Sequence, residues 1–493
     1  MMLRDPKHRR NRRVAWVAWT AVALVGCSVG PNYVRPAAET PPAYKEAQGW
    51  KVAEPKDQQP RGRWWSAFND PQLDALVTQV EISNQTIKAA EARVREARAL
   101  TQAARAAFFP VVTANASASR SGRGSGAGST GATGGSTGAT GGEGRSVGNS
   151  YNLALDVNWE VDLWGRVRRT VEASEATAQA SAADLESAKL SAQALLAEDY
   201  FLLRVQDAQI RLLNDTVAAY EKSQQLTRNQ YAVGVVGRVD VAQAETQLNS
   251  TRAQAIDATI QRAQLEHAIG VLIGKPPAEF SIAVADVPTG FPDIPAGVPS
   301  ELLERRPDIA AAERRAAAAN AQIGVAEAAF FPSLTLSATG GFQSSLLSHL
   351  ISLPSRYWSI GAALAQTIFD AGLRRAQTAQ AIATYDENVA NYRQTVLAGF
   401  QEVEDNLAAL RILEQEAEVQ DDAVKAARES LTIILNQYRA GTANYLAVVV
   451  VQATALANER TALTILGRRL TASVVLIKAL GGGWDASTLP APS

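Results

Sequence analysis

The chain has 493 residues, of which 46% are hydrophobic and 20% charged, and its formal net charge is −1. A chain of this length exceeds one ordinary hydrophobic core, so we expect several domains or an elongated molecule. The sequence lacks the concentrated basic face that nucleic-acid binding needs. Three histidines and a single cysteine leave too few ligands for a His/Cys metal site, so we expect no bound metal.

The first 26 residues have the composition of a secretory leader. They contain six Lys or Arg and one Asp, a net charge of +5, which leaves −6 for the rest of the chain. The apolar stretch 14–25 would rise about 18 Å as a helix, too little to cross a hydrocarbon core of about 30 Å. It ends in Leu-Val-Gly before Cys27, and this sequence resembles a bacterial lipobox. A secreted protein with one stray cysteine is the alternative.

Cys27 is the expected lipidation site. In a lipobox, the leader is cut before the cysteine and a diacylglyceryl group joins its sulfur. In the bacterial lipoproteins that this leader resembles, an aspartate at the next position signals retention at the inner membrane, so Ser28 implies export to the outer membrane. Several acyl chains on one residue anchor a protein stably where a single chain does not. We expect no cofactor other than this covalent lipid on Cys27.

Asp70 and Pro71 predict the start of the first helix, as N-cap and first helical residue. The helix is expected to run to about residue 107. The glycine-rich segment 122–148 follows a first short strand, and 12 of its 27 residues are glycine. Such a segment cannot build a core, so we expect an exposed loop, on the outer-surface side if the strands belong to a barrel.

Residues 151–163 alternate with a period of two. Apolar side chains face one way, and asparagine, aspartate and glutamate dominate the other face. Soluble strands usually have five or six residues, so thirteen residues with one apolar and one charged face predict a transmembrane barrel strand. The edge of a soluble β-sandwich is the alternative. Weaker alternation predicts three further strands, at 112–119, 334–338 and 358–364.

Two very long helices are predicted. Residues 166–233 contain neither glycine nor proline, and a helix of this length extends about 100 Å. The stretch 373–440 contains only Gly399 as a breaker. Shorter helices at about 72–107 and 239–272 together nearly match one long helix, so two of them could lie end to end beside it. An apolar seam in the second long helix has the heptad spacing of coiled-coil packing and comprises Ile382, Tyr385, Val389, Tyr392, Val396, Phe400, Val403, Leu407 and Leu410.

The sequence contains two similar halves. Ala-Ala-Phe-Phe-Pro at 106–110 recurs at 328–332, and Gln-Tyr-x-x-Gly at 230–234 recurs at 437–441. A repeat of this length indicates one structural unit used twice. Each copy is predicted to run helix, strand, strand, long helix, helix.

Four strands per chain cannot close a membrane barrel, because the smallest known barrels have eight. Open sheet edges are not tolerated in lipid, since their backbone groups would be unpaired. Two or more chains must therefore pool their strands. Polar inward faces then imply a water-filled lumen, which the long helices would extend away from the membrane.

Several motifs together carry a family resemblance. They are the lipobox followed by Val-Gly-Pro-Asn-Tyr at 29–33, the doubled Phe-Phe-Pro, the doubled Gln-Tyr-x-x-Gly, Glu-Arg-Arg-Pro-Asp-Ile at 304–309, and Ala-Leu-Gly-Gly-Gly-Trp at 479–484. Over essentially the whole chain, they resemble the TolC-like outer-membrane factors, specifically the lipoprotein branch (nodulation-T type) of resistance-nodulation-division (RND) efflux systems. The resemblance implies a mainly α protein with a transmembrane β part. It would be a homotrimer whose 12-stranded β-barrel, four strands per chain, is continuous with a long periplasmic α-helical coiled-coil barrel.

The function implied by the resemblance is that of a passive outer-membrane exit channel in a tripartite efflux pump, conducting small molecules such as drugs and toxic compounds. The implied partners are two further copies of the chain, a periplasmic adaptor protein, an inner-membrane RND transporter and outer-membrane lipid, without nucleic acid. The implied location is the outer membrane of a Gram-negative bacterium, lipid-anchored and barrel-inserted, with an extension into the periplasm. The exit channel of a type I protein-secretion system and a periplasmic coiled-coil structural lipoprotein are the alternatives.

The expected division of the chain follows from these assignments. It comprises a lipoprotein signal peptide (1–26), an N-terminal extended and equatorial segment (27–70), a first repeat (71–275), an equatorial linker (276–300), a second repeat (301–480) and a C-terminal tail (481–493). The resemblance implies that residues 40–65, 276–300 and the tail form a belt around the helical barrel.

The ends of the two helical hairpins are where the resemblance implies adaptor docking and gating. A glycine lets a long helix reverse and lets another backbone approach closely. Simple turn glycines are the alternative. The expected docking residues are Val233, Gly234, Val235 and Val236 at the first end, and Gly441 and Thr442 at the second.

The gate is expected to differ from that of the family, which often uses acidic residues in the second repeat. Here residues 445–451 contain no acid. We therefore hypothesise an apolar constriction near Ala447 and Val450. The residues expected to pin the hairpins around it are Tyr231, Arg238, Asp240, Tyr438 and Arg439, although each could equally be a solvated helix residue.

An enzyme is the remaining alternative. Glu304, Asp308 and Glu313 lie near four arginines and could suggest an acid/base cluster. Ion pairs on a solvated helix face explain these residues more simply, and no nucleophile–base set or phosphate loop is present. We therefore expect no catalytic residues.

Overall fold

The computed structural model describes residues 28–46, 63–123, 146–288, 290, 292, 294, 302–484 and 489. These residues are mostly helical, with one four-stranded sheet. They form two compact units. The first holds the described parts of 1–34, 98–175 and 317–386, and the second those of 35–97, 176–316 and 387–493. The leader with Cys27, most of the glycine-rich loop, and parts of the expected belt segments lie outside the described residues.

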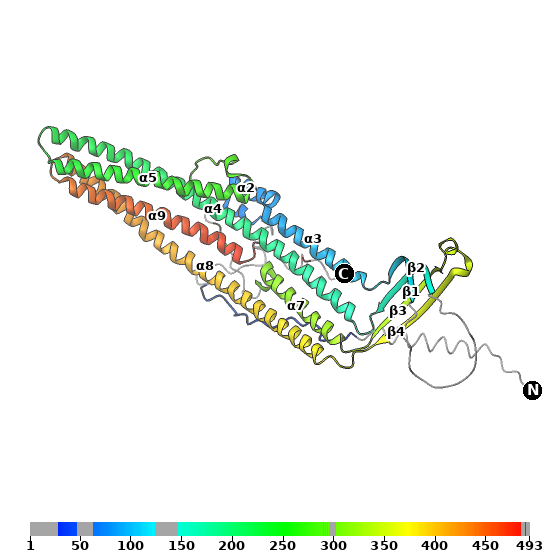
Figure 1. Ribbon diagram of the computed structural model, residues 1–493. Helices are drawn as coiled ribbons and strands as arrows, with labels where there is room; N and C mark the ends of the chain where they lie inside the picture. Colours follow the sequence, from blue (N-terminus) through cyan, green and yellow to red (C-terminus); the bar gives the residue numbers. More distant parts are fainter. Residues whose placement is uncertain are drawn as a thin grey trace, which may run out of the picture. The chain divides into compact units, whose positions relative to one another are not determined.

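Figure 1 labels most of the elements. In chain order they are η1 (Trp64–Phe68), α2 (Pro71–Ser83), α3 (Gln85–Ala106), β1 (Val111–Arg123), β2 (Ser146–Val161), α4 (Arg166–Ala232), α5 (Arg238–Leu272), η2 (Pro277–Glu279), α6 (Leu302–Arg305), α7 (Pro307–Ala328), β3 (Ser333–Ser344), η4 (Leu347–His349), η5 (Leu353–Ser355), β4 (Arg356–Ala365), α8 (Leu373–Arg439) and α9 (Tyr445–Ala479). Helices of 22, 67 and 35 residues occur in this order twice. None of the helices formed by the described residues has a stretch long and apolar enough to cross a membrane.

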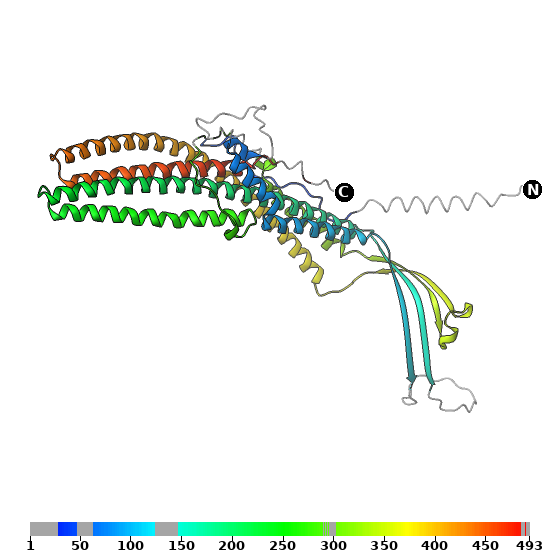
Figure 2. The same ribbon diagram turned by 90° about the horizontal axis from the view of Figure 1, so that it is seen from above.

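The first unit contains the sheet, which is antiparallel throughout and ordered β1-β2-β3-β4. All four predicted strands are confirmed, and Figure 2 shows β1 and β2 as extended, adjacent ribbons. The strands are 13, 16, 12 and 10 residues long. The second strand ends at Val161 rather than at residue 163. The Asp162 carboxylate instead accepts hydrogen bonds from the backbone of Val167 and Arg168 (3.0 and 2.9 Å) and caps α4.

The two faces of the sheet differ in polarity, as the alternation in 151–163 predicts. On one face, Asn115 of β1 and Thr339 of β3 each donate a 2.6 Å hydrogen bond to Asp156 of β2. On the other face, Leu155 and Ile360 are 56% and 78% exposed. The cross-strand register runs Val112–Val157–Ala338–Ile360 in one row and Thr113–Asp156–Thr339–Ser359 in the next.

In each copy of the Phe-Phe-Pro motif, a backbone carbonyl accepts a hydrogen bond from a tryptophan indole N–H. Trp159 Nε1 donates to the carbonyl of Phe108 (3.0 Å), and Trp164 Nε1 donates to that of Pro332 (2.8 Å). The Trp164 ring also stacks on Phe331, with ring centroids 4.8 Å apart. Both contacts lie within the first unit, where they connect the chain after α3 and α7 to residues at the end of β2 and just beyond it.

The second unit contains two long helical hairpins, α4 with α5 and α8 with α9, which lie side by side in both views (Figures 1 and 2). Ion pairs link the helices within each hairpin, Arg252 to Glu221 in the first and Arg428 to Glu459 in the second, both at 2.5 Å. Arg460 of α9 donates to Gln254 of α5 (2.9 Å) and joins the two hairpins.

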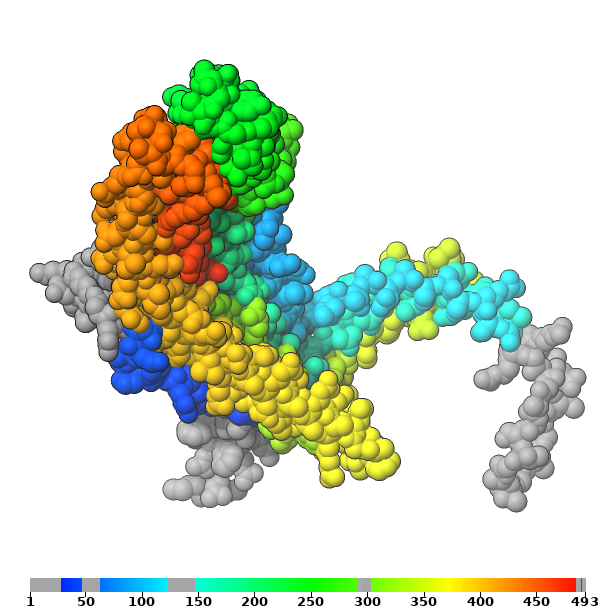
Figure 3. Space-filling model, turned by 90° about the vertical axis from the view of Figure 1, so that its left-hand side faces the viewer, coloured from blue at the N-terminus to red at the C-terminus, as the bar shows by residue number. Residues whose placement is uncertain are grey.

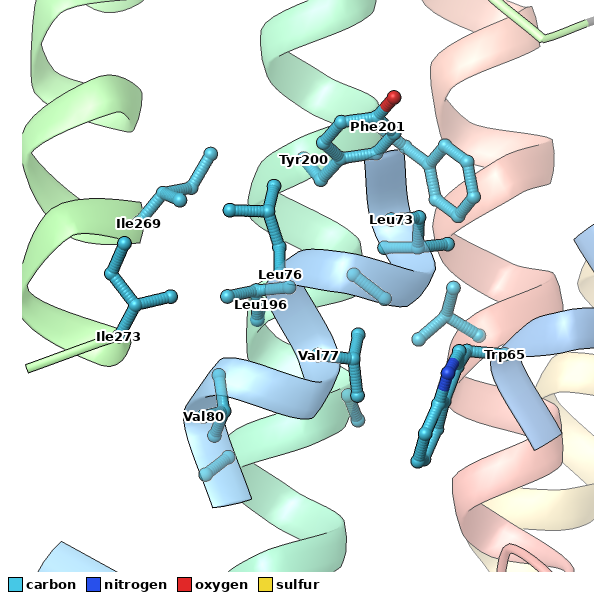
Figure 4. Close-up of a cluster of buried hydrophobic side chains, with 14 of the residues drawn as sticks. Trp65, Leu73, Leu76, Val77, Val80, Leu196, Tyr200, Phe201, Ile269 and Ile273 are labelled. Carbon is cyan, nitrogen blue, oxygen red and sulfur yellow. The ribbon is translucent and has the colours of Figure 1, made fainter. Parts of the chain in front are cut away.

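A hydrophobic core lies where α2, α4 and α5 meet (Figure 4). Leu73, Val77 and Val80 of α2 are completely buried. They pack with residues of α4 and α5, among them Phe201 and Ile269. Full burial of each such side chain contributes about 1.5–3 kcal/mol, so this cluster fixes α2 against the hairpin.

The single helix predicted from residue 71 to about 107 is wrong, because the helix breaks at Asn84. This residue has an extended ψ of 125°. Its side-chain oxygen accepts hydrogen bonds from the backbone of Thr86 and Ile87 (2.9 and 3.1 Å), which caps α3. Its amide nitrogen donates to the carbonyl of Leu272 (2.8 Å). The two shorter helices α3 and α5 therefore meet end to end, as their lengths predict.

Arg306 makes the corresponding junction in the second copy. It lies 222 residues after Asn84, and its guanidinium donates to the carbonyl of Ala479 at the end of α9 (3.0 Å). It also pairs with Asp308 (2.7 Å) and Glu402 (2.8 Å). The interpretation of this arginine-rich segment as a solvated face is therefore wrong in part. Arg306 and Glu313 are only 8% and 5% exposed. Arg306 is paired across helices with Glu402 and Ala479, and Glu313 is paired with the neighbouring Arg314 (2.5 Å).

A second buried ionic network holds part of the linker against the first hairpin. Arg204 and Asp207 of α4 are fully buried and pair at 3.0 Å, and Arg262 of α5 reaches the same carboxylate (2.8 Å). The two arginines also donate to the carbonyls of Ala283 and Ile282 (2.7 and 2.8 Å). These bonds fix residues 282–283 to both helices.

The apolar seam of α8 is confirmed from Tyr392 to Leu407. Tyr392, Val396, Phe400, Val403 and Leu407 are buried in one cluster. Ile382, at the start of the predicted seam, is instead 43% exposed. It belongs to the first unit, so it has no share in that cluster.

Candidate functional site at the hairpin ends

The α4–α5 hairpin ends in a turn held by two backbone hydrogen bonds. Gly234 N–H donates to the carbonyl of Tyr231 (3.0 Å), and Val235 N–H donates to that of Gln230 (2.9 Å). Gly234 has a φ of +78°, which glycine adopts without strain, so α4 can stop and reverse here. The Asp240 carboxylate then accepts a 3.0 Å bond from the N–H of Gly237 and closes the first turn of α5.

The α8–α9 hairpin repeats this turn with equivalent residues. Gly441 N–H donates to the carbonyl of Tyr438 (3.1 Å), and Thr442 N–H donates to that of Gln437 (2.9 Å). Gly441 has a φ of +72°. Asn444 caps α9 by accepting a 2.9 Å bond from the N–H of Ala447. The Gln-Tyr-x-x-Gly motif thus encodes the same C-terminal helix cap twice.

The two ends differ in surface chemistry. Figure 3 looks onto them and shows the green α4–α5 turn and the orange α8–α9 turn as neighbouring lobes. At the first end, Val233 and Val235 are 76% and 65% exposed. At the second end, the exposed turn residues are small or polar, Ala440, Gly441 and Thr442, and Leu446 in the first turn of α9 is 54% exposed. The first turn itself is therefore apolar, whereas the second turn is small and polar with one exposed leucine beside it.

Tyr438 and Tyr231 occupy equivalent positions but different environments. Tyr438 is 3% exposed, and its hydroxyl lies 2.9 Å from that of Thr227 on α4. Its ring meets Tyr445 of α9 edge to face, with centroids 5.4 Å apart. Burial raises the pKa of Tyr438 and raises that of Tyr445 to about 12, so both stay neutral at physiological pH. Tyr231 is 44% exposed.

The charged residues expected at the gate are less closely connected. Asp240 closes the start of α5 through Gly237, and its charge lies close enough to Tyr438 to contribute to the raised pKa. Arg439 donates to Asn436 one turn back on its own helix (3.3 Å). Arg238 is exposed and has no ion-pair partner among the described residues. Of the predicted residues, Tyr438 has the clear hydrogen bond from one hairpin to the other.

The expected apolar constriction involves α9 just after its cap. Ala447 is partly exposed, and Val450 is 56% exposed in the single chain. Val448 between them is fully buried, in a cluster with Tyr438, Tyr445 and Ala244. Val450 is therefore available to face a lumen or another chain, whereas Val448 holds the two hairpins together.

Several contributors to this site were not singled out from the sequence. Thr227 and the pair Gln452–Ser223 (3.3 Å) connect the two hairpins by hydrogen bonds. Tyr445 contributes through the buried cluster that it shares with Ala244 of α5. Tyr445 could have been noticed as a large aromatic residue directly after an N-cap asparagine, in a segment otherwise rich in valine. Thr227 carries no such signal, because a threonine within a long helix is unremarkable.

The chemistry of the hairpin ends is that of turn backbone, tyrosine hydroxyls and aliphatic side chains, which suit helix packing and contact with another protein. In the described part of the chain, no group of three or more His, Cys, Asp or Glu side chains is arranged to hold a metal ion.

Comparison with known proteins decides the family. The model of the outer membrane efflux protein family matches residues 76–275 and 298–482, which include both hairpins and all four strands. The chain belongs to the outer membrane efflux protein family. As a member of this family it is a channel component of an efflux system, located in the outer membrane of a Gram-negative bacterium.

Relatives of this outer membrane efflux protein match it over nearly their full length. The probable efflux pump outer membrane protein TtgC of Pseudomonas putida is 33% identical over 480 residues, 96% of each chain. The pyoverdine export outer membrane protein OpmQ of Pseudomonas aeruginosa is 32% identical over 427 residues, 86% of this chain and 88% of the relative.

Solved structures of outer-membrane channels share the fold. The OprN channel has a TM-score of 0.84 and 32% identity, covering 93% of this chain and all of the other. The CmeC channel of Campylobacter jejuni has a TM-score of 0.83 and 25% identity, covering 94% and 96%. Both the sheet and the helical hairpins of this efflux protein thus have counterparts in channel structures.

Proposed function

We propose that this efflux protein is the passive exit duct of a three-component pump, built from three copies of the chain. The observation that carries the proposal is the four-stranded sheet, in which β1 and β4 each have a partner on one side only among the described residues. Unpaired backbone groups are not tolerated in lipid. In the proposed trimer, β4 of one copy pairs with β1 of the next, and twelve strands close the barrel.

The polarity of the sheet supports a water-filled lumen. The face with Asn115, Asp156 and Thr339 would line the lumen, and the exposed Leu155 and Ile360 on the opposite face would contact lipid. The long helices would continue the duct into the periplasm as a helical barrel. Their matching lengths in the two halves support an internal twofold repeat, with repeats at 71–275 and 301–480 separated by a linker at 276–300.

The hairpin ends would meet the partners. The exposed valines 233 and 235 supply an apolar docking surface for a periplasmic adaptor, with the small residues Gly441 and Thr442 beside it. Closure would rest on Val450 and Ala447 around the axis, with Tyr438 holding the hairpins. Tyr231, Arg238, Asp240 and Arg439 remain proposed contributors. The inner-membrane transporter would supply the energy, so this protein needs no catalytic residue.

Cys27 is the proposed lipid attachment site and would add a second anchor beside the barrel. The cargo is proposed to be small molecules, since relatives of this chain include outer membrane proteins of an antibiotic efflux pump, of a toluene efflux pump and of pyoverdine export. A protein-secretion duct would require a protein cargo, and nothing in these relatives favours one.

Electron microscopy of detergent-purified full-length protein tests the architecture. The proposal predicts trimers with a hollow stalk on the order of 100 Å long, as the 67-residue helices require. Single-channel recording in planar bilayers tests conduction in the same preparation. Monomers, solid rods, or trimers that never conduct would each contradict the duct.

A further inference from the structure

The first residues after the leader are bound tightly within the first unit. Val29 N–H donates to the carbonyl of Trp164 (3.0 Å), just before α4 begins. Asn320 of α7 donates to the carbonyl of Pro31 (3.0 Å). The segment 28–32 therefore lies between the start of α4 and the later part of α7, fixed from both sides.

Arg169 is the centre of this contact. Its guanidinium donates to the carbonyls of Val29 (3.2 Å) and Gly30 (3.1 Å), and to the side-chain oxygen of Asn32 (3.0 Å). It also forms an ion pair with Glu172, one turn along α4 (2.8 Å). The Arg169 side chain is only 5% exposed. The buried guanidinium thus donates three hydrogen bonds to one short peptide segment, and it forms a specific binding site for that segment.

Two glycines make the close approach possible. A Cβ on Gly30 would lie 2.4 Å from the Cα of Gly324, and Gly30 has a φ of +96°. A Cβ on Gly324 would lie 2.9 Å from the Arg169 side chain. Any side chain at either position would push the segment away from the helices or displace the arginine.

We propose that Arg169, Gly324 and Asn320 form a dock for residues 28–32, which seats the lipid-bearing end of the mature chain at the point where β2 passes into α4. Ser28 is one peptide unit, about 3.8 Å, from the proposed lipid attachment residue. The dock therefore holds the anchor at a fixed place beside the membrane strands. Arg169 is a positioning residue in this scheme, which rests on the proposed lipidation of Cys27.

The advantage of such a dock follows from effective concentration. Acyl chains on a loose N-terminal arm would hold the protein near the membrane without orienting it. Acyl chains held beside β2 bring the strand ends to the bilayer in the orientation that insertion needs, since tethering helps only when its geometry fits. The lipid then acts in assembly as well as anchoring.

Label mobility tests whether the dock holds the segment. Val34 is 76% exposed, and Cys27, the only native cysteine, is blocked by its lipid, so Val34→Cys can carry a nitroxide on the full-length protein. Arg169→Gln and Gly30→Ala should shorten the rotational correlation time of the label at least about threefold. The matched control is Arg166→Gln, which removes the Glu160 ion pair (2.6 Å) on the same helix turn but no contact with the segment. An unchanged correlation time in Arg169→Gln would overturn the dock.

The link to the lipid is tested by comparing two backgrounds. Arg169→Gln should lower the temperature at which trimers dissociate more in the lipidated protein than in Cys27→Ala, where only its contacts within the chain are lost. An equal drop in both backgrounds would mean that Arg169 stabilises the polypeptide independently of the lipid, and would overturn the proposal. If Arg169→Gln fails to fold, Asn320→Ala removes a single hydrogen bond to Pro31 and gives the same comparison in a milder form.

Different results would contradict the proposed function and the proposed dock. A wild-type protein that forms no trimer, or that carries no acyl group on Cys27, would contradict the duct or the anchor. The mobility measurement would still report on whether residues 28–32 are held, because all of their contacts lie within one chain.

Discussion

The hydroxyl oxygens of Tyr438 and Thr227 lie 2.9 Å apart and join the end of α8 to α4, across 211 residues of sequence. Both groups are buried, and the Thr227 hydroxyl also reaches the carbonyl of Ser223 (3.0 Å). The contact lies one helical turn from the end of the second hairpin. Any separation of the two hairpins must break this contact, so in the proposed gate it sets part of the free energy of opening.

Tyr438→Phe should loosen this closure. The change keeps the ring against Tyr445 and removes the hydrogen bond, which contributes about 1 kcal/mol. We expect a several-fold higher open probability in planar bilayers. Tyr438→Ala should leak more strongly, because it also removes the buried ring. The matched control is Thr432→Val on the same helix, which removes an exposed hydroxyl that donates to the carbonyl of Arg428 one turn back. Closed channels in Tyr438→Ala would refute a role in gating.

Asp207→Asn should destabilise the second unit strongly. Asp207 is the shared counter-charge of Arg204 and Arg262, and both Asp207 and Arg204 are completely buried. The amide keeps the size but leaves a buried guanidinium without its partner, a loss of about 3–5 kcal/mol. Thermal unfolding followed by helical circular dichroism measures this effect.

The control for Asp207 is Glu221→Gln, which breaks the exposed ion pair with Arg252. The N–O distance in this pair is 2.5 Å, comparable to the 3.0 Å between Arg204 and Asp207. An exposed pair contributes about 0–1 kcal/mol. If the two variants unfolded at the same temperature, the buried network would have no special part in holding the linker.

Asp199 should make stability depend on pH. Burial raises the pKa of this carboxyl from 3.8 to about 6. The folded chain therefore binds the proton more tightly than the unfolded chain, and the free energy of unfolding falls as pH rises from about 4 through 6. Asp199→Asn should raise the unfolding temperature at about pH 7.5 and change it little at about pH 4, where the carboxyl is protonated.

The control for Asp199 is Asp257→Asn, an exposed carboxylate on α5. Burial also raises the pKa of Glu198, the neighbour of Asp199, so a smaller dependence of the same sign should persist in Asp199→Asn. A variant that stabilises equally at both pH values would show that the charge of Asp199 is not the cause.

Cys27→Ala should remove the lipid without abolishing the trimer. In the proposed trimer, strand pairing and helix packing supply the contacts between copies, and a closed barrel satisfies its own backbone in lipid. Mass spectrometry of the mature N-terminus should show the loss of the acyl groups, and gel filtration in detergent should still show trimers. Loss of the trimer, or complete failure of barrel insertion, would mean that the barrel cannot form without the lipid, which is more than the assistance in assembly proposed above.

The long helices and their turns were predictable because they depend on residues close together in the sequence, namely the absence of helix breakers and the glycine at each turn. Residues 166–233 contain no breaker, and the observed helix ends at Ala232, two residues before Gly234 takes a positive φ. The break at Asn84 was not predictable, since asparagine is tolerated within helices and its partner, the Leu272 carbonyl, is 188 residues away.

The different burial of equivalent residues in the two copies of a motif could not be predicted from the sequence either. Tyr231 and Tyr438 share one motif, but only Tyr438 is buried. Its partner Thr227 corresponds to Ile434 in the other copy, and Tyr445 corresponds to Arg238. The burial of Arg306 was hidden for the same reason, because a charged residue beside a proline suggests surface until its acceptors are located in space.

The hydrogen bonds to Asp156 have a consequence for how the sheet finds its alignment. β1 is composed largely of valine, alanine and serine, and such a strand could slide along its neighbour by two residues without exchanging its faces. Asn115 is the residue of β1 whose amide reaches Asp156, with Thr339 holding the same carboxylate from the far side. A slip of β1 that pairs Asn115 with Asn152 instead of Ala154 would move the amide away from that charge. The carboxylate of Asp156 therefore penalises misalignment of β1 in that direction, although the small side chains of β1 barely specify its alignment.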